Sequence, residues 1–286
     1  MTSPPAAREP GRRNPVAGGR RVGWVESTRE VLIAFDKQAR SAPTDPPAGI
    51  RYEPDGPVVR VVGEERGFIS APRDTGFRGA ELDALIARQR DYFAARGEAV
   101  EWKTYDYDEP ADLPDRLRAA GFVPEPAETV VVALTSAIAA DPVLPDGVVL
   151  RQVTADADMH RIGAMESEVW QTDRDWAAGR LIREVAAAPE DYIVLVAEAA
   201  GRVIAAGWLE MRPGARFAGL WGGATLREWR GRGIYRALVA RRAQLAAARG
   251  VCYLQVDAST DSAPILRRLG FQPLATTTPY VWSPAQ

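Results

Sequence analysis

The chain contains little of what several protein classes depend on, beginning with cysteine and histidine. Its 286 residues include one cysteine, Cys252, and one histidine, His160. A single cysteine excludes an internal disulfide and favours a reducing compartment. Because Cys252 stands in the apolar run VCYLQV, we expect it to be buried as a small hydrophobic residue. We predict no metal site, and we interpret His160 as a surface or packing residue.

Long hydrophobic runs and a strong charge of either sign are also missing. No segment approaches the roughly 18 apolar residues that a membrane helix needs. The formal net charge is -2, so the composition gives no support for binding to nucleic acid or to a membrane. The first residues are rich in proline, glycine and arginine and lack the apolar segment of a secretory signal. We expect residues 1–22 to form a disordered tail and the protein to be cytoplasmic.

Two parts of the chain resemble each other. Residues 81–97, ELDALIARQRDYFAARG, match residues 234–250, IYRALVARRAQLAAARG, at an offset of 153. Residues 112–129 match residues 261–278 at an offset of 149, with the glycine–phenylalanine pair in common. The period is too long for a solenoid repeat. We therefore predict two copies of one domain, at residues 23–138 and 145–286, joined by a linker near residues 139–146.

The pattern of the second copy predicts a mixed α/β domain. A strand at residues 147–153 precedes two helices, and the apolar runs on either side of the turn at Ala200 and Gly201 form a hairpin. A further strand leads into a helix over residues 234–249, followed by the strand VCYLQV, a short helix and a last strand. Each copy is thus expected to be a mixed, mostly antiparallel sheet flanked by helices.

The sequence RGRGIY, residues 230–235, lies where a strand gives way to a helix. Glycines at this place let the backbone approach an anion, and the free amides at the start of the helix attract negative charge. The spacing is neither the dinucleotide-binding pattern GxGxxG nor a Walker A loop. Arginine–glycine segments also bind RNA, but such segments are normally disordered and repeated. The stretch is therefore typical of a pyrophosphate-binding turn.

With these elements in this order, the second copy resembles the GNAT N-acetyltransferases, which transfer acyl groups from acyl-coenzyme A to amines. The family motif is Gln/Arg-x-x-Gly-x-Gly/Ala, and residues 230–235 fit every fixed position except the last. The later LRRLGF segment, residues 266–271, also matches. The resemblance implies an acyl-CoA site whose residues are Ala224, Thr225 and Leu226 along the pantetheine, Arg230, Gly231, Arg232, Gly233, Ile234 and Tyr235 at the pyrophosphate, and Ser259 and Ser262 beyond the next strand.

Three departures from the family pattern stand out. Tyr235 replaces a small residue, although its backbone amide remains available. Ser259 stands where the family often has asparagine. Leu266 stands where the family often has the tyrosine that protonates the leaving thiolate, so another group serves or the thiolate leaves to water. In the first copy the corresponding loop, residues 77–81, reads FRGAE, and we predict a degenerate copy that binds no acyl-CoA.

Acyl transfer to an amine needs a group that takes the proton of the attacking nitrogen. We predict Glu210, near a strand end, and Glu168, in the helical segment beside the acceptor cleft, as the leading carboxylates. Tyr280, in the last strand, is the candidate acid for the thiolate. Trp170 and Trp176 flank QTDRD in the same acceptor region and are candidates to line a pocket.

These observations predict a tandem GNAT-like protein that moves an acetyl group from acetyl-CoA to an amine of a small molecule or peptide, by direct attack. The partners expected are a CoA thioester and a small amine, with the protein a monomer or homodimer. The alternative from another class is a non-catalytic acyl-CoA-binding or regulatory protein, which Leu266 favours. RNA binding through the arginines is a third reading, and it predicts salt-sensitive association.

Overall fold

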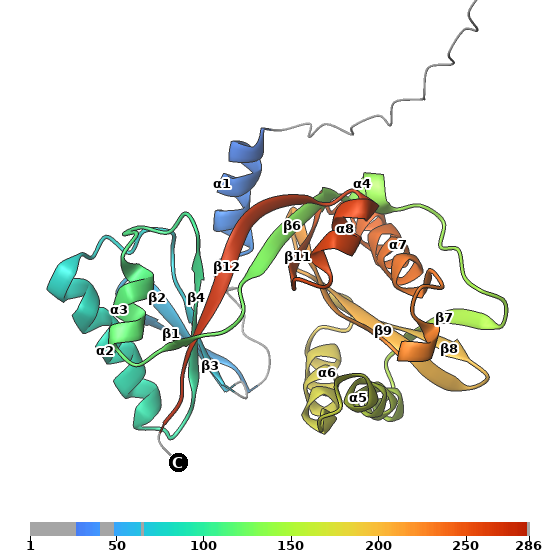
Figure 1. Cartoon of the computed structure of the whole chain (residues 1–286), viewed down its shortest axis with the longest axis horizontal. Helices are drawn as coiled ribbons and strands as arrows, with labels where there is room; N and C mark the ends of the chain where they lie inside the picture. Colours follow the sequence, from blue (N-terminus) through green and yellow to red (C-terminus); the bar gives the residue numbers. More distant parts are fainter. Residues whose placement is uncertain (1–26, 41–48, 64–65, 285–286) are drawn as a thin grey trace, which may run out of the picture.

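The computed structural model describes residues 27–40, 49–63 and 66–284; the predicted tail, residues 1–22, lies outside them. The described residues form one mixed, mostly antiparallel sheet of twelve strands with helices on its faces (Figure 1). We call residues up to 138 the first half and residues from 147 onward the second half. No helix in the described ranges is long and apolar enough to cross a membrane.

The first half places two helices, α2 (Gly79–Ala94) and α3 (Leu113–Ala119), beside a small sheet (Figure 1). Its elements are α1 (Thr28–Gln38), β1 (Arg51–Asp55), β2 (Val58–Val62), β3 (Gly67–Ser70), α2 (Gly79–Ala94), β4 (Val100–Tyr105), α3 (Leu113–Ala119), β5 (Val123–Pro124), β6 (Glu128–Leu134) and α4 (Thr135–Ile138).

The second half has helices on both faces of its sheet, with α5 and α6 on one and α7 and α8 on the other (Figure 1). Its elements are β7 (Val148–Val153), α5 (Asp156–Trp170), α6 (Asp175–Ala187), β8 (Tyr192–Ala199), β9 (Arg202–Met211), β10 (Phe217–Thr225), a 3-10 turn (Arg227–Trp229), α7 (Ile234–Ala248), β11 (Tyr253–Ala258), α8 (Ala263–Leu269) and β12 (Gln272–Trp282). This order agrees with the order expected from the sequence.

The halves exchange strands. β6 belongs to the first half in sequence but pairs with β11 of the second half. β12 crosses in the other direction and pairs with β4 and β5 of the first half. Between the halves β6 and β12 pair with each other (Figure 1). The sheet order is therefore β1-β2-β3-β4-β12-β6-β11-β10-β9-β8-β7, with β5 beside β12. Each predicted domain thus completes its sheet with a strand from the other.

The register of the exchanged strands follows the 149-residue offset found in the sequence. Gln272 lies opposite Val132, and shifting both positions by 149 residues gives the pair Val123 and Val281. The next pair along the strands obeys the same relation. Because a slip of one residue turns every side chain to the other face, matching registers place the two similar segments in equivalent positions.

Helix α1 packs across the seam between the halves. It begins with a capping box, in which Ser27 and Glu30 satisfy each other's backbone amides. The ring of its buried Phe35 lies 5.8 Å from the ring of Tyr105 in β4 and 5.9 Å from that of Phe217 in β10, between centroids. One hydrophobic face of α1 therefore contacts both halves.

The prediction that Cys252 is buried is wrong. Cys252 is exposed, because β11 begins only at Tyr253 and Cys252 lies in the connection from α7. Val251 and Tyr253, on either side of Cys252, are buried. The strand therefore lacks the first two residues of the apolar run VCYLQV.

Candidate functional site

The two parallel strands β10 and β11 separate part of the way along their length. Residues 217–219 of β10 pair with residues 253–255 of β11. Beyond Gly219 and Gln255, among residues that the structure describes, each strand pairs only with its outer neighbour, β10 with β9 and β11 with β6. The divergence leaves a wedge with its apex at these two residues, open toward the carboxyl ends of both strands. Ligands of α/β proteins commonly bind at such a divergence of parallel strands.

The chain leaves the open end of the wedge through a turn with unused backbone amides. Gly231 and Gly233 have φ of +75° and +85°, which glycine adopts without strain. Within the described part of the chain, the amides from Gly231 to Arg236 meet no hydrogen-bond acceptor. Such a series at the amino terminus of a helix is suited to bind a phosphate group.

The side chains of the two arginines in this turn are engaged with the protein itself. Arg230 Nε donates a hydrogen bond of 3.0 Å to the carbonyl of Thr225. The guanidinium of Arg232 lies 4.9 Å from the centre of the Trp229 ring. The capacity of the turn to bind an anion therefore rests mainly on its amides, and the arginines add charge at its edge.

Tyr235 turns its side chain into the fold. A Cβ on Gly223 would lie 2.7 Å from the Tyr235 ring, so the ring packs directly on the backbone of the bulge in β10. Burial raises the pKa of Tyr235. The ring thus points away from the turn, while the amide of Tyr235 stays within the series of unused amides.

Arg242, two turns further along α7, holds the same bulge. Its Nη1 donates to the carbonyls of Trp208 and Trp221 at 3.1 and 3.0 Å. A Cβ on Gly207 would lie 3.0 Å from this nitrogen, so the glycine leaves room for it. Burial lowers the pKa of Arg242 to about 10. The guanidinium thus binds the backbone of both β9 and β10 beside the bulge.

A small pocket lies at the apex of the wedge. Its floor is Gly219, which faces Glu210 on β9 and Gln255 on β11. Trp221 folds back along β10, so that a Cβ on Gly219 would lie 2.6 Å from the indole Nε1. The pocket has a volume of about 60 Å³. Its other lining residues are Gln38 and Ala39 of the first half, with Arg212, Ala215 and Phe217.

Polar atoms without partners gather around this pocket. Trp221 Nε1 and Gln255 Oε1 are buried and find no hydrogen-bond partner among the described residues, and neither does Asp257 Oδ1, further into the wedge on β11. The carboxylate of Glu210, about one-third exposed, lies 3.5 Å from Arg212 Nε. Buried polar groups are normally satisfied, so this arrangement indicates a site for a small polar group.

The first half reaches the wedge through Lys103 of β4. Its Nζ donates to Asp257 Oδ2 at 2.8 Å, and both side chains are largely buried. Burial alone would lower the pKa of Lys103, but Asp257 and its neighbours raise the pKa above its ordinary value. The ammonium therefore stays charged and balances one oxygen of Asp257, leaving the other oxygen unpaired.

The structure brings Glu210 to the pocket but not Glu168. Glu168 accepts two hydrogen bonds from Arg202 at the first residue of β9, at 2.8 and 2.7 Å. Glu210 lies eight residues further along β9, about 26 Å away at the rise of an extended strand. The carboxylate of Glu168 is half exposed, and it occupies the opposite end of the strand from the pocket.

Tyr280 does not fit its predicted role, because the last strand crosses into the first half. It is buried in the hydrophobic core that contains Trp102 and Phe122, and Arg118 lies 5.3 Å from its ring centre. Leu266, at the position of the family's tyrosine, is fully buried in the core of the second half. Neither residue offers a proton at the wedge.

The remaining predicted residues take varied places. Ser259 and Ser262 follow the end of β11 at the open side of the wedge, with their hydroxyls 3.2 Å apart. The amide of Leu226 donates to the Ile204 carbonyl, and its own carbonyl accepts from the amide of Trp229. The pairing of residues 224–226 with the pantetheine stays a prediction. Trp170 and Trp176 are exposed and do not line the pocket.

Glu166 of α5 is a buried carboxylate away from the pocket. It is 2% exposed, and its nearest cation, Arg174, lies 3.7 Å away. Burial raises the pKa of Glu166 above the ordinary 4.5, and Arg174 opposes this shift only in part. The folded state therefore favours the protonated form of Glu166. This preference contributes fully to the stability of the fold below pH 4.5, the ordinary pKa, and the contribution is lost as the pH rises through the raised pKa.

We expect Glu166→Gln to increase the free energy of unfolding at pH 7 by roughly 1 kcal/mol, since it removes a buried charge that is poorly paired. The difference from the unmodified protein should vanish below about pH 4, where both side chains are neutral. Urea denaturation at the two pH values measures it. A loss of stability at pH 7 would show that the attraction to Arg174 outweighs the burial.

The sequence matches a known family over part of its length. Residues 157–271 match the model of the acetyltransferase (GNAT) family, so this part of the chain is a GNAT acetyltransferase domain. The match covers β10, the turn, α7 and β11. No curated protein matches the sequence.

Several solved structures share the fold over most of the chain. A GCN5-related N-acetyltransferase from Kribbella flavida has a TM-score of 0.62 at 18% identity, over 91% of this chain and 95% of that one. A tandem GNAT protein from the clavulanic acid biosynthesis pathway gives 0.61 at 15% identity, over 91% and 96%. A GCN5-related N-acetyltransferase from Sphaerobacter thermophilus gives 0.56 at 18% identity, over 91% and 86%. At these identities the likeness concerns the fold.

Proposed function

We propose that the GNAT domain at residues 157–271 transfers an acetyl group from acetyl-CoA to an amine of a small molecule or peptide. The observation that carries this proposal is one continuous arrangement along β10. The strand has the Glu210 pocket at the apex of the wedge and the unused amides of residues 231–236 at its open end. An anion site and a carboxylate at the two ends of the divergence between β10 and β11 suit a long, phosphorylated thioester and a nucleophile.

The residues of the wedge fit the parts of acetyl-CoA. The amides of residues 231–236 would bind the pyrophosphate, with the positive end of the α7 dipole behind them. The pantetheine arm would lie between the diverging strands, beside Ala224 in the bulge and across from Ser259. This placement leaves the thioester toward the apex, next to the backbone of Gly219 and the indole of Trp221.

The chemistry follows from the groups at the apex. The neutral nitrogen of the amine attacks the thioester carbonyl, the C–N bond forms and the C–S bond breaks. Glu210 takes the proton that the nitrogen loses, directly or through a water molecule. The indole N–H of Trp221 is a donor available to a developing oxyanion. Since Leu266 and Tyr280 supply no acid, the CoA thiolate takes its proton from solvent.

The alternative function, acyl-CoA binding without catalysis, rests on this missing acid. A thiolate has a far lower proton affinity than an alkoxide, since a thiol has a pKa near 8.5, so catalysis does not require the acid. The two functions differ in turnover. Release of free thiol from acetyl-CoA, followed with a thiol reagent across a panel of primary amines, supports the transferase, whereas saturable binding with no thiol release supports the alternative.

The first half is proposed as a degenerate copy that binds no acyl-CoA. Its α2 corresponds to α7, and its parallel pair β3 and β4 corresponds to β10 and β11. Some of the amides around the start of α2 already have acceptors: Gly76 donates to Asp74 at 2.8 Å, and Glu81 donates to the Arg78 carbonyl. Two carboxylates, Asp74 and Glu81, also stand where a pyrophosphate would have to bind.

Acetyl-CoA binding tests the turn directly. We expect Gly233→Val to raise the Kd for acetyl-CoA at least about tenfold, because a β-branched residue at φ +85° strains the turn and displaces its amides. Gly250→Val, at the other end of α7 with φ +75°, carries a similar strain and should leave the Kd within about twofold. Isothermal titration calorimetry measures both. Equal losses in the two variants would place the CoA site elsewhere.

A further inference from the structure

Three consecutive residues at the end of α1 contact three different parts of the molecule. Gln38 bonds to the second half, Arg40 bonds to the first half, and Ala39 between them lines the pocket at the apex of the wedge. Ala39 also closes the helix, since its amide donates to the Phe35 carbonyl at 2.8 Å. The position of Ala39 is therefore fixed from both sides.

Gln38 attaches α1 to the turn between β9 and β10. Its Oε1 accepts a hydrogen bond of 2.7 Å from the amide of Arg216. Its carbonyl accepts a bond of 3.3 Å from Nη1 of Arg212, the residue whose Nε lies beside the Glu210 carboxylate. The end of α1 is thus connected through one arginine to the candidate base.

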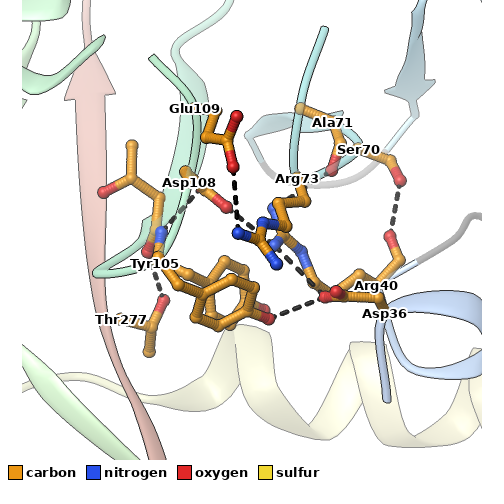
Figure 2. A network of polar contacts seen from close by, with 11 residues as sticks. Asp36, Arg40, Ser70, Ala71, Arg73, Tyr105, Asp108, Glu109 and Thr277 are labelled. Carbon is orange, nitrogen blue, oxygen red and sulfur yellow. Dashed lines mark hydrogen bonds and ion pairs between the residues drawn. The ribbon is translucent and has the colours of Figure 1, made fainter. Parts of the chain in front are cut away.

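Arg40 anchors the same end in the first half (Figure 2). Its side chain is 3% exposed, and Nη1 donates to Asp108 at 2.7 Å. The guanidinium lies 4.0 Å from the centre of the Tyr105 ring. The Arg40 carbonyl accepts a bond of 2.9 Å from the Ser70 hydroxyl. A buried ion pair with a stacked ring holds the backbone here more firmly than surface contacts do.

We propose that the end of α1, supplied by the first half, forms the outer wall of the amine pocket in the second half, and that Ala39 selects amines whose nitrogen stands on an unbranched CH₂ group. The inference rests on the proposed function. The pocket volume of about 60 Å³ corresponds to roughly four to six water molecules, at about 10–15 Å³ each on the same measure. An aminomethyl group fits this space, and a branch next to the nitrogen on the side of the wall would meet the methyl group of Ala39, which lines the pocket.

The wall is also a function of the first half that does not require CoA binding. The half that we propose binds no acyl-CoA supplies the surface that closes the acceptor side of the other half.

A tethered amine tests the wall without knowledge of the natural acceptor. The background is Cys252→Ser, because Cys252 is exposed and a thiol reagent would label it as well. In this background, Ala39→Cys is labelled with 2-aminoethyl methanethiosulfonate, which leaves a primary amine on a CH₂ group at position 39. The matched control is Ile33→Cys, labelled in the same way, on the exposed face of α1.

We expect acetyl-CoA to acetylate the amine at position 39 at least about tenfold faster than the amine at position 33, because the tether holds it beside the thioester. The acetyl group moves from sulfur to nitrogen, the nitrogen loses one proton, and CoA is released as the thiol. Intact-mass spectrometry detects one added acetyl group per label, and adding Glu210→Gln should remove the difference.

Free amines test the selectivity. We expect the unmodified protein to favour ethylamine over isopropylamine in kcat/KM by at least about tenfold, and Ala39→Gly to reduce this preference. If free amines are acetylated but positions 39 and 33 react alike, the wall is wrong and the proposed function stands. If neither free nor tethered amines react while acetyl-CoA binds, the transferase function fails and the wall with it.

Discussion

Glu210→Gln is expected to lower kcat for amine acetylation by about 100- to 10,000-fold, the usual contribution of a positioned general base. The variant keeps the shape of the side chain and its place opposite Gly219, so the pocket should remain. The Kd for acetyl-CoA should stay within about twofold, because the amides that bind the pyrophosphate lie at the other end of the wedge. Steady-state kinetics with thiol detection, together with calorimetry, measure the two effects.

The same measurements on Glu168→Gln decide between the two carboxylates predicted from the sequence. Glu168 is bonded to Arg202 at the far end of β9, and its loss should change kcat by less than about threefold. A large loss of kcat in Glu168→Gln, with little change in Glu210→Gln, would overturn the site as described.

The second large effect concerns stability. Arg40→Met is expected to lower the free energy of unfolding by about 3–5 kcal/mol, because it leaves Asp108 buried without its partner. The side chain of Asp108 is 5% exposed, and burial already raises its pKa although Arg40 opposes the shift. Urea denaturation at pH 7, followed by circular dichroism, measures the change.

Two further variants compare the contribution of the buried Arg40–Asp108 pair to the free energy of unfolding with that of an exposed ion pair. Arg73→Met removes the exposed pair with Glu109 in the same cluster (Figure 2), and it should cost less than about 1 kcal/mol. Combining Arg40→Met with Asp108→Leu removes both buried charges, and it should recover much of the loss. If Arg40→Met costs no more than Arg73→Met, Arg40 does not anchor the end of α1 as described.

The parts of the site that lie close together in the sequence were predictable. The turn at residues 230–235 combines a strand end, two glycines and a helix start, which are local features that a single sequence displays. The position of Glu210 near a strand end was also visible. What the sequence did not show was its neighbour across the strands, because the register that sets Gly219 between Glu210 and Gln255 depends on pairing between distant segments.

The roles given to Tyr280 and to α1 show where local reasoning stops. Tyr280 belongs to the second copy in sequence, and only the crossing of β12 into the first half moves it away from the wedge. The helix α1 did carry a signal, since Ser27 and Glu30 have the spacing of a capping box ahead of apolar residues. Nothing local, however, indicated that Ala39 would line a pocket formed mostly by residues 210–255.

The exchange of strands has a consequence for how the protein is made. The core of the first half includes Tyr280, and β4 finds its partner in residues 277–282, more than half the chain away. During synthesis the first half therefore emerges with an unpaired strand edge and waits for the end of the chain before its sheet closes. Such long-range pairing slows folding, so a chain that terminates before β12 leaves both halves incomplete and open to aggregation.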